Sequence, residues 1–421
     1  MTTYRLIGPF SQIITFENAQ LNGPIPYQSD SLISEHSWIL FAGNTIEALG
    51  SKADLLDMVS NKSDLTIDEI EGNAVAIPGI IDSHTHICFG GSRYKDYAAR
   101  NAGVPYLEIA KQGGGIKSSV KSTRESSEVE LMQGILRRTQ EMALRGVTTA
   151  EVKSGYGLSV EAEIKMLKSI QEANCRTELD LIPTCLAAHT IPKMDGLDES
   201  TYLELIKNEI LPQVKSQNLS NRVDIFIEKE SFTKDLSTAY LLHAKELGFD
   251  ITVHADQFSV GGSEVAANVG AVSADHLENS TEREIAKLVK ANVVCTALPG
   301  ASIGLGEPFT PARKILDEGG ILSIASDWNP GSAPQGHLVM QASVLGTFQK
   351  LTNEELLAGI TFRAAAALNL EDRGKLSKGL LADMTVFPVG DFNEIFYYQG
   401  MVAPSYVYKN GKELYKKLLN P

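Results

Sequence analysis

The sequence predicts an α/β protein in which a (β/α)8 TIM-type barrel is joined to a small β-sandwich domain built from both chain termini. Two observations predict this fold. In the middle of the chain, short apolar runs that rarely alternate with polar residues recur between helical stretches, which is typical of parallel strands buried on both faces. Towards both termini, short apolar runs alternate with turns, which is typical of antiparallel sheets.

Eight apolar runs are candidate barrel strands, and eight strand–helix units favour a closed barrel over a doubly wound open sheet. Ser159 can cap the helix after the second run, and Gly248 can end the helix before the fifth. Gly113–Gly115 is not part of a G-x-G-x-x-G motif after a strand, which weakens a nucleotide-binding open sheet. The eight runs are Val75–Ile81, Thr148–Val152, Leu179–Thr184, Val223–Ile227, Ile251–Val253, Ala271–Ala274, Asn292–Thr296 and Ile321–Ala325.

The domain boundaries follow from the change in pattern near both ends. Residues 77–376 are expected to form the barrel, and residues 1–76 and 377–421 the two parts of the β-sandwich domain. Asn410-Gly411 between two apolar runs is a hairpin signal in the C-terminal part.

An unusually long segment separates the first two barrel strands. It contains Gly90-Gly91 and Gly113–Gly115. A mobile lid over the barrel rim and a plain surface insertion both explain such a segment.

The composition argues against several classes of function. The 421 residues include 38 basic and 52 acidic side chains, a formal charge of −14, so neither nucleic acid nor an anionic membrane surface is an expected partner. No run approaches the roughly 18 uninterrupted apolar residues of a membrane span, and the first residues do not read as a signal peptide. We therefore expect a cytoplasmic protein.

The cysteines share no C-x-x-C spacing, which argues against a disulfide framework and against a cysteine zinc site. We expect four buried thiols in a reducing compartment, at Cys88, Cys175, Cys185 and Cys295.

Histidines concentrate where the predicted strands end. The chain has 8 histidines, and three of them lie elsewhere, at His36, His243 and His337. Barrel active sites are built at the carboxyl ends of the strands. One histidine there is most often structural, but five together with Asp327 predict a functional site. The five are His84, His86, His189, His254 and His276.

The histidine pattern indicates metal chemistry. His84 and His86 point to the same side of a strand because side chains alternate, so both can bind one ion. Three imidazoles and one carboxylate with an open position are typical of a catalytic metal site, where the ion lowers the pKa of bound water and polarises a carbonyl. Asp327 is the candidate base for that water.

With these residues in place, the chain resembles the amidohydrolase superfamily over nearly its full length. Residues 78–86 read P-G-x-x-D-x-H-x-H, and His254, His276 and the late Asp327 follow. Further segments are similar to the imidazolonepropionase family of histidine degradation. These segments are Phe89–Arg93, Val152–Gly157, His254–Gln257, Ser273–Leu277 and Ser326–Ser332.

The resemblance implies hydrolysis of the cyclic amide of 4-imidazolone-5-propanoate to N-formimidoyl-L-glutamate, and it allows a homodimer. It implies one divalent metal ion, Zn²⁺ or Fe²⁺, held by His84, His86, His254 and Asp327. It implies substrate contacts from Arg93, Tyr156, His189, Gln257, Asn329, Gly331 and Ser332. We expect catalytic roles for Asp327, His276 and Gln257.

These residue types suit such a substrate. The guanidinium of Arg93 is a fork of donors for the propionate carboxylate, and Tyr156 offers a hydroxyl and a ring that can pack on the flat imidazolone. Gln257 can both donate to and accept from the ring amide. Some members of the family carry Glu at position 257, so Gln257 here favours Asp327 or His276 as the base.

Three alternatives remain at this point. A deaminase of nucleobases or other cyclic amidines would use the same histidines and aspartate, but its substrate has no carboxylate for Arg93. A catalytically inactive barrel acting as a scaffold would be expected to have lost metal ligands. A second metal bridged by a carboxylated Lys229 would resemble binuclear relatives.

Overall fold

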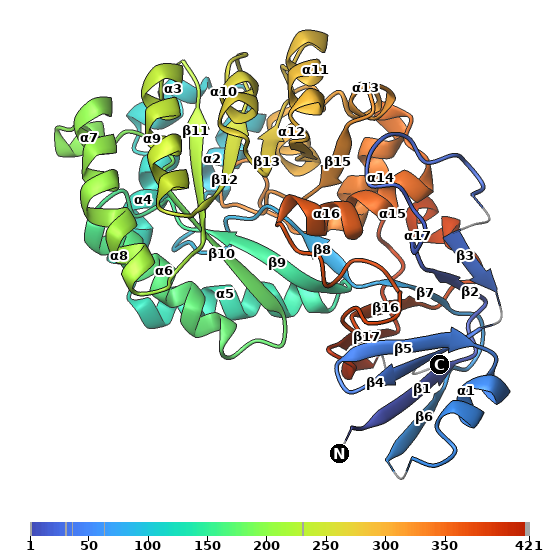
Figure 1. The fold of residues 1–421 in the computed structure, drawn as a ribbon. Helices are drawn as coiled ribbons and strands as arrows, with labels where there is room; N and C mark the ends of the chain where they lie inside the picture. The colour runs from blue at the N-terminus through green and yellow to red at the C-terminus, as the bar shows by residue number, and fades with distance from the viewer. Residues whose placement is uncertain (1, 30–31, 36, 63, 230, 417–421) are drawn as a thin grey trace.

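A sheet of parallel strands forms the centre of the computed structural model, which describes residues 2–29, 32–35, 37–62, 64–229 and 231–416 (Figure 1). Within these ranges, 8 strands follow one another in chain order, and each pairs in parallel with the next. They are β8 (Ile80–Asp82), β9 (Val147–Lys153), β10 (Asp180–Ala188), β11 (Arg222–Ile227), β12 (Asp250–Ala255), β13 (Ser273–His276), β14 (Val294–Ala297) and β15 (Ile321–Ile324).

The sheet closes on itself just beyond the carboxyl ends of β8 and β15. The main-chain N–H of Asp327 donates to the carbonyl of His84 (3.0 Å), and the N–H of His86 donates to the carbonyl of Trp328 (2.9 Å). Thr85 and Trp328 form an isolated parallel bridge. Closure therefore joins two segments that are remote in sequence at the rim where barrel active sites lie.

Helices surround the barrel (Figure 1). Ser159 caps α6 by accepting the N–H of Ala162, and α9 ends before Gly248, whose φ is 80°, so both predicted helix ends are confirmed. The helices and single turns from β8 onward are α2 (Tyr94–Asn101), α3 (Tyr106–Lys111), α4 (Ile116–Glu125), α5 (Glu128–Ala143), α6 (Val160–Asn174), η2 (Lys193–Asp195), α7 (Glu199–Leu205), η3 (Ile206–Ile210), α8 (Leu211–Ser216), α9 (Lys234–Glu246), α10 (Gly262–Val269), α11 (Glu282–Lys290), α12 (Pro299–Leu305), α13 (Ala312–Asp317), α14 (Leu338–Gln349), α15 (Asn353–Gly359), α16 (Phe362–Ala367) and α17 (Asn393–Tyr397).

Two further sheets lie beside the barrel and are built from both ends of the chain (Figure 1). One contains, in spatial order, β5 (Thr45–Gly50), β4 (Trp38–Ala42), β1 (Tyr4–Gly8) and β6 (Leu65–Glu69), with α1 (Lys52–Met58) after β5. The other contains β18 (Lys412–Lys416), β17 (Tyr406–Lys409), β16 (Met384–Phe387), β7 (Val75–Pro78), β2 (Gln12–Ile14) and β3 (Ile33–Glu35).

The two sheets share one apolar core and so form a β-sandwich. Buried side chains from both sheets make up this core, among them Ile7, Phe41, Ala76, Met384 and Tyr408. The predicted fold class, a (β/α)8 barrel with a β-sandwich from both termini, is confirmed. The domain boundaries after residues 76 and 376 stay a prediction.

The turn at Asn410-Gly411 joins β17 to β18 as predicted. Both residues have left-handed φ, 51° and 75°, and the two strands are antiparallel.

The predicted strand Val75–Ile81 is two strands, and the prediction of one was wrong. β7 pairs with β16 and β2 in the sandwich, whereas β8 opens the barrel. Gly79 lies between them, and a Cβ at this position would come within 2.3 Å of the Thr148 hydroxyl. The chain therefore passes from one sheet to the other at a point where only glycine fits against the neighbouring strand.

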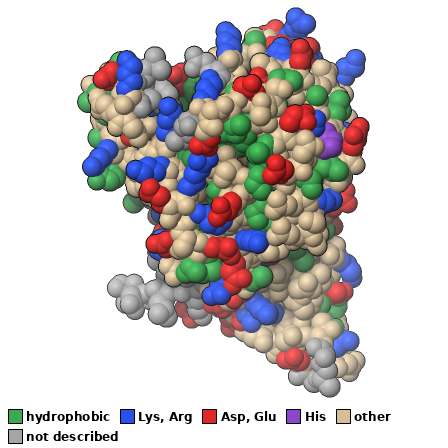
Figure 2. All heavy atoms as spheres, turned by 90° about the vertical axis from the view of Figure 1, so that its left-hand side faces the viewer, with side chains coloured by type: hydrophobic (Ala, Val, Ile, Leu, Met, Phe, Trp, Pro, Cys, Tyr) green, Lys and Arg blue, Asp and Glu red, His purple; other side chains and the backbone are tan. Residues whose placement is uncertain are grey.

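The surface carries both signs of charge. Figure 2 shows acidic and basic side chains interspersed over the face at the left of Figure 1. Among the helices that the structure describes, none has the length and apolar composition to cross a membrane. The cysteines are free thiols, and Cys175 is exposed, so the expectation of four buried thiols was wrong for Cys175 because it follows the exposed end of α6.

Candidate metal centre and active site

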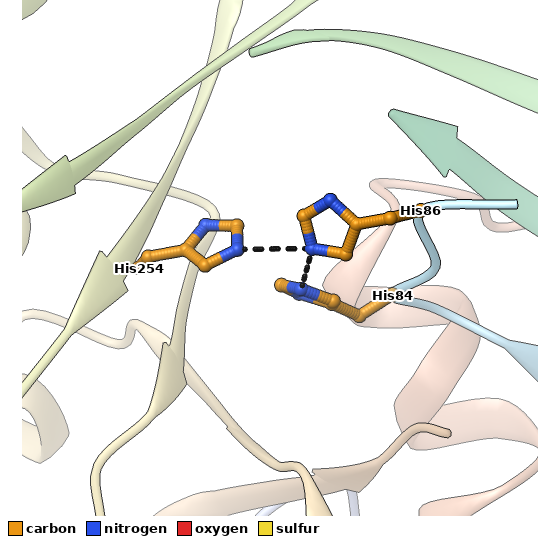
Figure 3. A group of neighbouring side chains, drawn as sticks. All are labelled: His84, His86 and His254. Carbon is orange, nitrogen blue, oxygen red and sulfur yellow. Dashed lines mark hydrogen bonds between the residues drawn. The ribbon is translucent and has the colours of Figure 1, made fainter. Parts of the chain in front are cut away.

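Three histidine side chains point their Nε2 atoms at one another inside the carboxyl end of the barrel (Figure 3). His84 and His86 follow β8, and His254 lies on β12. The Nε2 of His86 is 3.3 Å from that of His84 and 3.3 Å from that of His254. All three residues are buried. Alternation after β8 thus places the first two imidazoles on one side, as the sequence indicated.

Asp327, which follows β15, is the fourth member of this cluster. It lies where the barrel closes between β15 and β8. Its Oδ1 is 3.6 Å from Nε2 of His84 and 3.4 Å from Nε2 of His86. A tetrahedral ion with bonds of about 2.1 Å separates neighbouring ligand atoms by about 3.4 Å. The measured separations match that spacing, so this histidine-rich site fits a divalent metal ion.

A buried carboxylate lies close to Nδ1, the second ring nitrogen, of two of these histidines. Nδ1 of His84 lies 2.6 Å from Oδ2 of Asp275, and Nδ1 of His254 lies 2.9 Å from Oδ2 of Asp224. A carboxylate accepts the N–H of the imidazole, which leaves the Nε2 lone pair free for a metal. Asp275 thus selects the ring form of His84 that a metal ligand requires, and Asp224 lies at ion-pair distance from Nδ1 of His254.

Burial also keeps the histidines uncharged. Burial lowers the pKa of His84 well below its ordinary value, with the nearby cation of Lys153 acting in the same direction. Burial lowers the pKa of His86 to about 4, against the opposing effect of Asp327. Burial would raise the pKa of Asp327, but its contact with His86 and the other histidines holds it below the ordinary value. Neutral imidazoles beside a carboxylate are the ionisation states that bind a metal ion.

His276 lies at the edge of the same site. Its ring centre is 5.4 Å from that of His254 and 6.0 Å from that of His84. Its Nδ1 is 3.2 Å from Oε1 of Glu278. Burial opposes protonation of His276, but the charges of Glu278 and Asp327 outweigh it and raise the pKa of the imidazole. His276 can therefore carry a proton at a pH where His86 cannot.

Tyr156 and His189 cover the cluster on another side. The ring of His189 stacks on His86 with centres 5.2 Å apart and planes at 19°, and the ring of Tyr156 is 5.3 Å from that of His189. Nδ1 of His189 lies 3.0 Å from the carbonyl of Gly155. Because a carbonyl only accepts, Nδ1 carries the proton and Nε2 has a free lone pair.

Arg93 borders a cavity of about 210 Å³, together with the predicted site residues Asn329 and Gly331 and with Phe89 and Tyr97. A Cβ on Gly331 would come within 2.2 Å of Nη1 of Arg93, so the absence of a side chain there makes room for the guanidinium. Nε of Arg93 donates to Oδ2 of its neighbour on α2, Asp96, at 2.9 Å.

Asn329 and Ser332 contact Asp327 directly. Nδ2 of Asn329 donates to Oδ2 of Asp327 (2.9 Å) and lies 2.8 Å from Oγ of Ser332, whose hydroxyl is 3.4 Å from the same Oδ2. Oδ1 of Asn329 accepts the main-chain N–H of Gly331 (2.7 Å) and of Ser332 (2.8 Å). The amide of Asn329 is therefore bonded within this loop and to the acidic ligand.

Gln257 follows β12 and is half-buried, and its main-chain carbonyl accepts a hydrogen bond of 2.6 Å from Nδ2 of Asn279. Lys229, considered as a bridge between two metals, is exposed. A carboxylated lysine must lie inside the site, so the structure does not support that alternative.

Sequence reasoning missed a buried ion network beneath the histidines. Nζ of Lys153 is 2.6 Å from Oε1 of Glu151 and 2.8 Å from Oδ2 of Asp224, and all three side chains are buried. The sequence does hold a sign of this network, because Glu151 and Lys153 are charged residues in the otherwise uncharged strand β9. Lys153 links that strand to Asp224, which contacts His254.

The chain is similar to known proteins over nearly its full length. Residues 75–414 match the family model of the amidohydrolase family. The chain is 40% identical over 420 residues to the imidazolonepropionase of Streptococcus sanguinis, with 98% of each protein covered. It is 39% identical over 389 residues to the imidazolonepropionase of Fusobacterium nucleatum, covering 92% of this chain and 93% of the relative.

Among solved structures, the fold is similar to that of an atrazine chlorohydrolase from Arthrobacter aurescens complexed with zinc, with a TM-score of 0.70 and 17% identity over 98% of this chain and 95% of that chain. At that identity the likeness concerns the fold, and the extended matches to curated relatives identify the family. The chain therefore belongs to the amidohydrolase family and, within it, to the imidazolonepropionases.

Proposed function

We propose that this enzyme hydrolyses the ring amide C–N bond of 4-imidazolone-5-propanoate to N-formimidoyl-L-glutamate, a step in the degradation of L-histidine. The observation that carries the proposal is the position of Arg93. The guanidinium of Arg93, which suits a carboxylate, borders a cavity that is also lined by the loop after Asp327. One small acid in this cavity can therefore contact both Arg93 and that loop. Relatives that cover nearly the whole chain are imidazolonepropionases.

We propose that His84, His86, His254 and Asp327 hold one divalent ion, Zn²⁺ or Fe²⁺. Imidazole and carboxylate ligands suit both metals. When bound, the ion would act as a Lewis acid that lowers the pKa of a water molecule and polarises the amide carbonyl.

The protein's own residues supply the proton transfers. Asp327, whose pKa is held below its ordinary value, accepts a proton from the attacking water as the water oxygen bonds to the ring carbonyl carbon. His276 can donate a hydrogen bond to the oxygen that becomes negatively charged, since its pKa is raised by Glu278 and Asp327. The C–N bond then breaks, and the proton on Asp327 passes to the leaving nitrogen.

Other residues orient the substrate. Arg93 pairs with the propionate, and Tyr156 and His189 face the ring from beside His86. Gln257 donates to and accepts from the ring amide.

The residues of the loop after β15 have two different roles. Asn329 and Ser332 act mainly through Asp327, which both contact, while Gly331 leaves space for the guanidinium of Arg93.

One assay tests the function. Purified protein loaded with Zn²⁺ or Fe²⁺ is given 4-imidazolone-5-propanoate, and the loss of imidazolone absorbance and the release of ammonia are both followed. The proposal predicts loss of absorbance without ammonia, abolished by a chelator and restored by the metal. Ammonia release in step with turnover would instead support a deaminase, and no metal-dependent turnover would contradict the proposal.

A further inference from the structure

A buried glutamate on α6 forms hydrogen bonds to main-chain groups outside its own helix. Glu163 lies in the first turn of α6 and is fully buried. An acidic side chain in a first turn ordinarily benefits from the helix dipole and from N–H groups of its own helix. The carboxylate of Glu163 instead accepts hydrogen bonds from three main-chain N–H groups that precede the helix.

The three donors belong to the loop that leaves β9. Oε1 of Glu163 accepts the N–H of Gly157 (2.8 Å) and of Leu158 (2.8 Å), and Oε2 accepts the N–H of Gly155 (3.0 Å). One carboxylate thus fixes the main chain on both sides of Tyr156.

The loop and the glutamate fit closely enough to require the glycines. A Cβ on Gly157 would come within 2.6 Å of the main-chain nitrogen of Glu163 and 2.8 Å of its Oε1. Gly155 has a φ of 108°, and a Cβ there would lie 2.8 Å from the carbonyl of Leu186. Glycine at position 157 therefore permits the close approach to Glu163, and glycine at position 155 permits the left-handed turn against Leu186.

The same loop positions two side chains of the candidate active site. Tyr156 projects from it, and the centre of its ring lies 5.3 Å from the ring centre of His189 and 6.0 Å from that of His86. The carbonyl of Gly155 accepts the Nδ1 proton of His189 at 3.0 Å, which sets the tautomer of that histidine. The bond from Gly155 N–H to the carboxylate orients this peptide segment.

We propose that Glu163 is a positioning residue, whose carboxylate holds residues 154–158 so that Tyr156 and His189 face the substrate beside the metal ligands. The three hydrogen bonds of its carboxylate go to this loop, and the four predicted metal ligands come from other elements. The kinetic part of this proposal rests on the proposed function, whereas the effect on the loop itself does not.

The first test measures the loop directly. In Glu163→Gln, the side chain keeps one acceptor oxygen and gains an NH₂ that cannot accept, so at least one of the three hydrogen bonds is lost. Amide hydrogen exchange at Gly155, Gly157 and Leu158 should accelerate at least tenfold, and the side-chain resonances of Tyr156 and His189 should shift. Glu161→Gln, an exposed residue in the same first turn, is the matched control and should leave both unchanged. Unchanged exchange and resonances in Glu163→Gln would overturn the proposal.

A second measurement separates positioning from general damage to the site. The four predicted metal ligands come from other elements, so the affinity of the apoprotein of Glu163→Gln for Zn²⁺, measured by competition with a chelator, should stay within about twofold of wild type. A much weaker affinity would show that the substitution disturbs the metal centre itself and would overturn the proposal.

The third test is a double-mutant comparison of kcat/KM on 4-imidazolone-5-propanoate. Glu163→Gln should lower kcat/KM about tenfold in the wild-type background. In a background of Tyr156→Phe with His189→Gln, the same substitution should lower it less than threefold, because the residues it positions are already altered. An equal loss in both backgrounds would overturn the proposal. If the wild type does not turn over this substrate, the proposed function fails, while the exchange, resonance and zinc measurements still decide the role of Glu163.

Discussion

Oδ2 of Asp275 accepts a hydrogen bond of 2.6 Å from Nδ1 of His84, and both side chains are buried. The same oxygen accepts a bond of 3.2 Å from the hydroxyl of Thr252. Asp275 comes from β13 and His84 follows β8, so the barrel brings the pair together from opposite parts of the chain. The contact directs Nε2 of His84 towards His86 and Asp327, and it gives the first prediction.

Asp275→Asn should weaken metal binding about 10- to 100-fold, the usual effect of losing a partner of a metal-ligating histidine. The asparagine can turn its NH₂ towards Nδ1 and favour the wrong tautomer of His84. Zinc affinity of the apoprotein, measured by chelator competition, checks this. Asp250→Asn, at the start of β12 and half-exposed, is the control and should bind zinc like wild type. Equal affinities for Asp275→Asn and wild type would show that the contact does not tune the ligand.

Asp327→Asn should reduce kcat on 4-imidazolone-5-propanoate by two to four orders of magnitude, roughly the effect of losing a general base. The amide can still contact a metal through its oxygen, but it cannot take a proton from water. Because Asp327 is also a predicted ligand, metal content must be measured on the same sample. Near-normal kcat with metal bound would remove Asp327 from the role of base.

Arg93→Ala should raise KM for the propionate substrate strongly, because truncating one partner of a buried charge pair costs about 2–5 kcal/mol. The Arg93 side chain is 13% exposed, so a bound carboxylate would be largely shielded from water. Steady-state kinetics with the propionate substrate and with an imidazolone that lacks the propionate provide the measurement. The loss should be confined to the propionate substrate, and Arg137→Ala, at an exposed position of α5, should behave like wild type. A similar loss on both substrates would give Arg93 another role.

The sequence alone was sufficient for the parts of this protein that depend on local pattern. Alternation after β8 placed His84 and His86 together, and strand ends located His254 and His276 on one rim. The fold class followed from apolar runs in the same way. The approach of Asp327 to His84 depended on closure of the barrel, which the count of strand–helix units correctly indicated.

Features that depend on side-chain direction across strands could not be predicted. The contact of Lys153 with Asp224 joins β9 to β11, and the strand pattern does not say which buried charges meet. The hydrogen bonds of the Asn329 amide to Asp327 and to its own loop were likewise not predictable from the strand pattern, and its substrate contact stays a prediction. The split of Val75–Ile81 at Gly79 was hidden because both strands are apolar.

Lys153→Met should destabilise the fold by about 3–5 kcal/mol, because it leaves the buried carboxylates of Glu151 and Asp224 without their shared cation. The double variant Lys153→Met with Glu151→Gln should recover part of that loss, since one unpaired charge is removed with its partner. Denaturant unfolding of the apoproteins checks both. A single variant as stable as wild type, or a double variant less stable than the single one, would contradict the inference that the cation compensates these acids.

The stability of the metal-free protein should fall as the pH is lowered from about 6.5 to about 4. Burial holds the pKa of His86 at about 4, below the ordinary value of 6.5, so in this window the unfolded chain binds a proton that the folded chain does not. The contribution is complete above pH 6.5 and is lost as the pH falls towards 4. The pKa values of His84 and His189 are lowered in the same direction and add to the slope, whereas the raised pKa of His276 acts oppositely, its contribution being lost as the pH rises. Thermal midpoints of chelator-treated protein between pH 4 and pH 8 measure this. His86→Gln should show a shallower decline than wild type without abolishing it, and an equally steep decline in both proteins would show that His86 is not among the groups responsible.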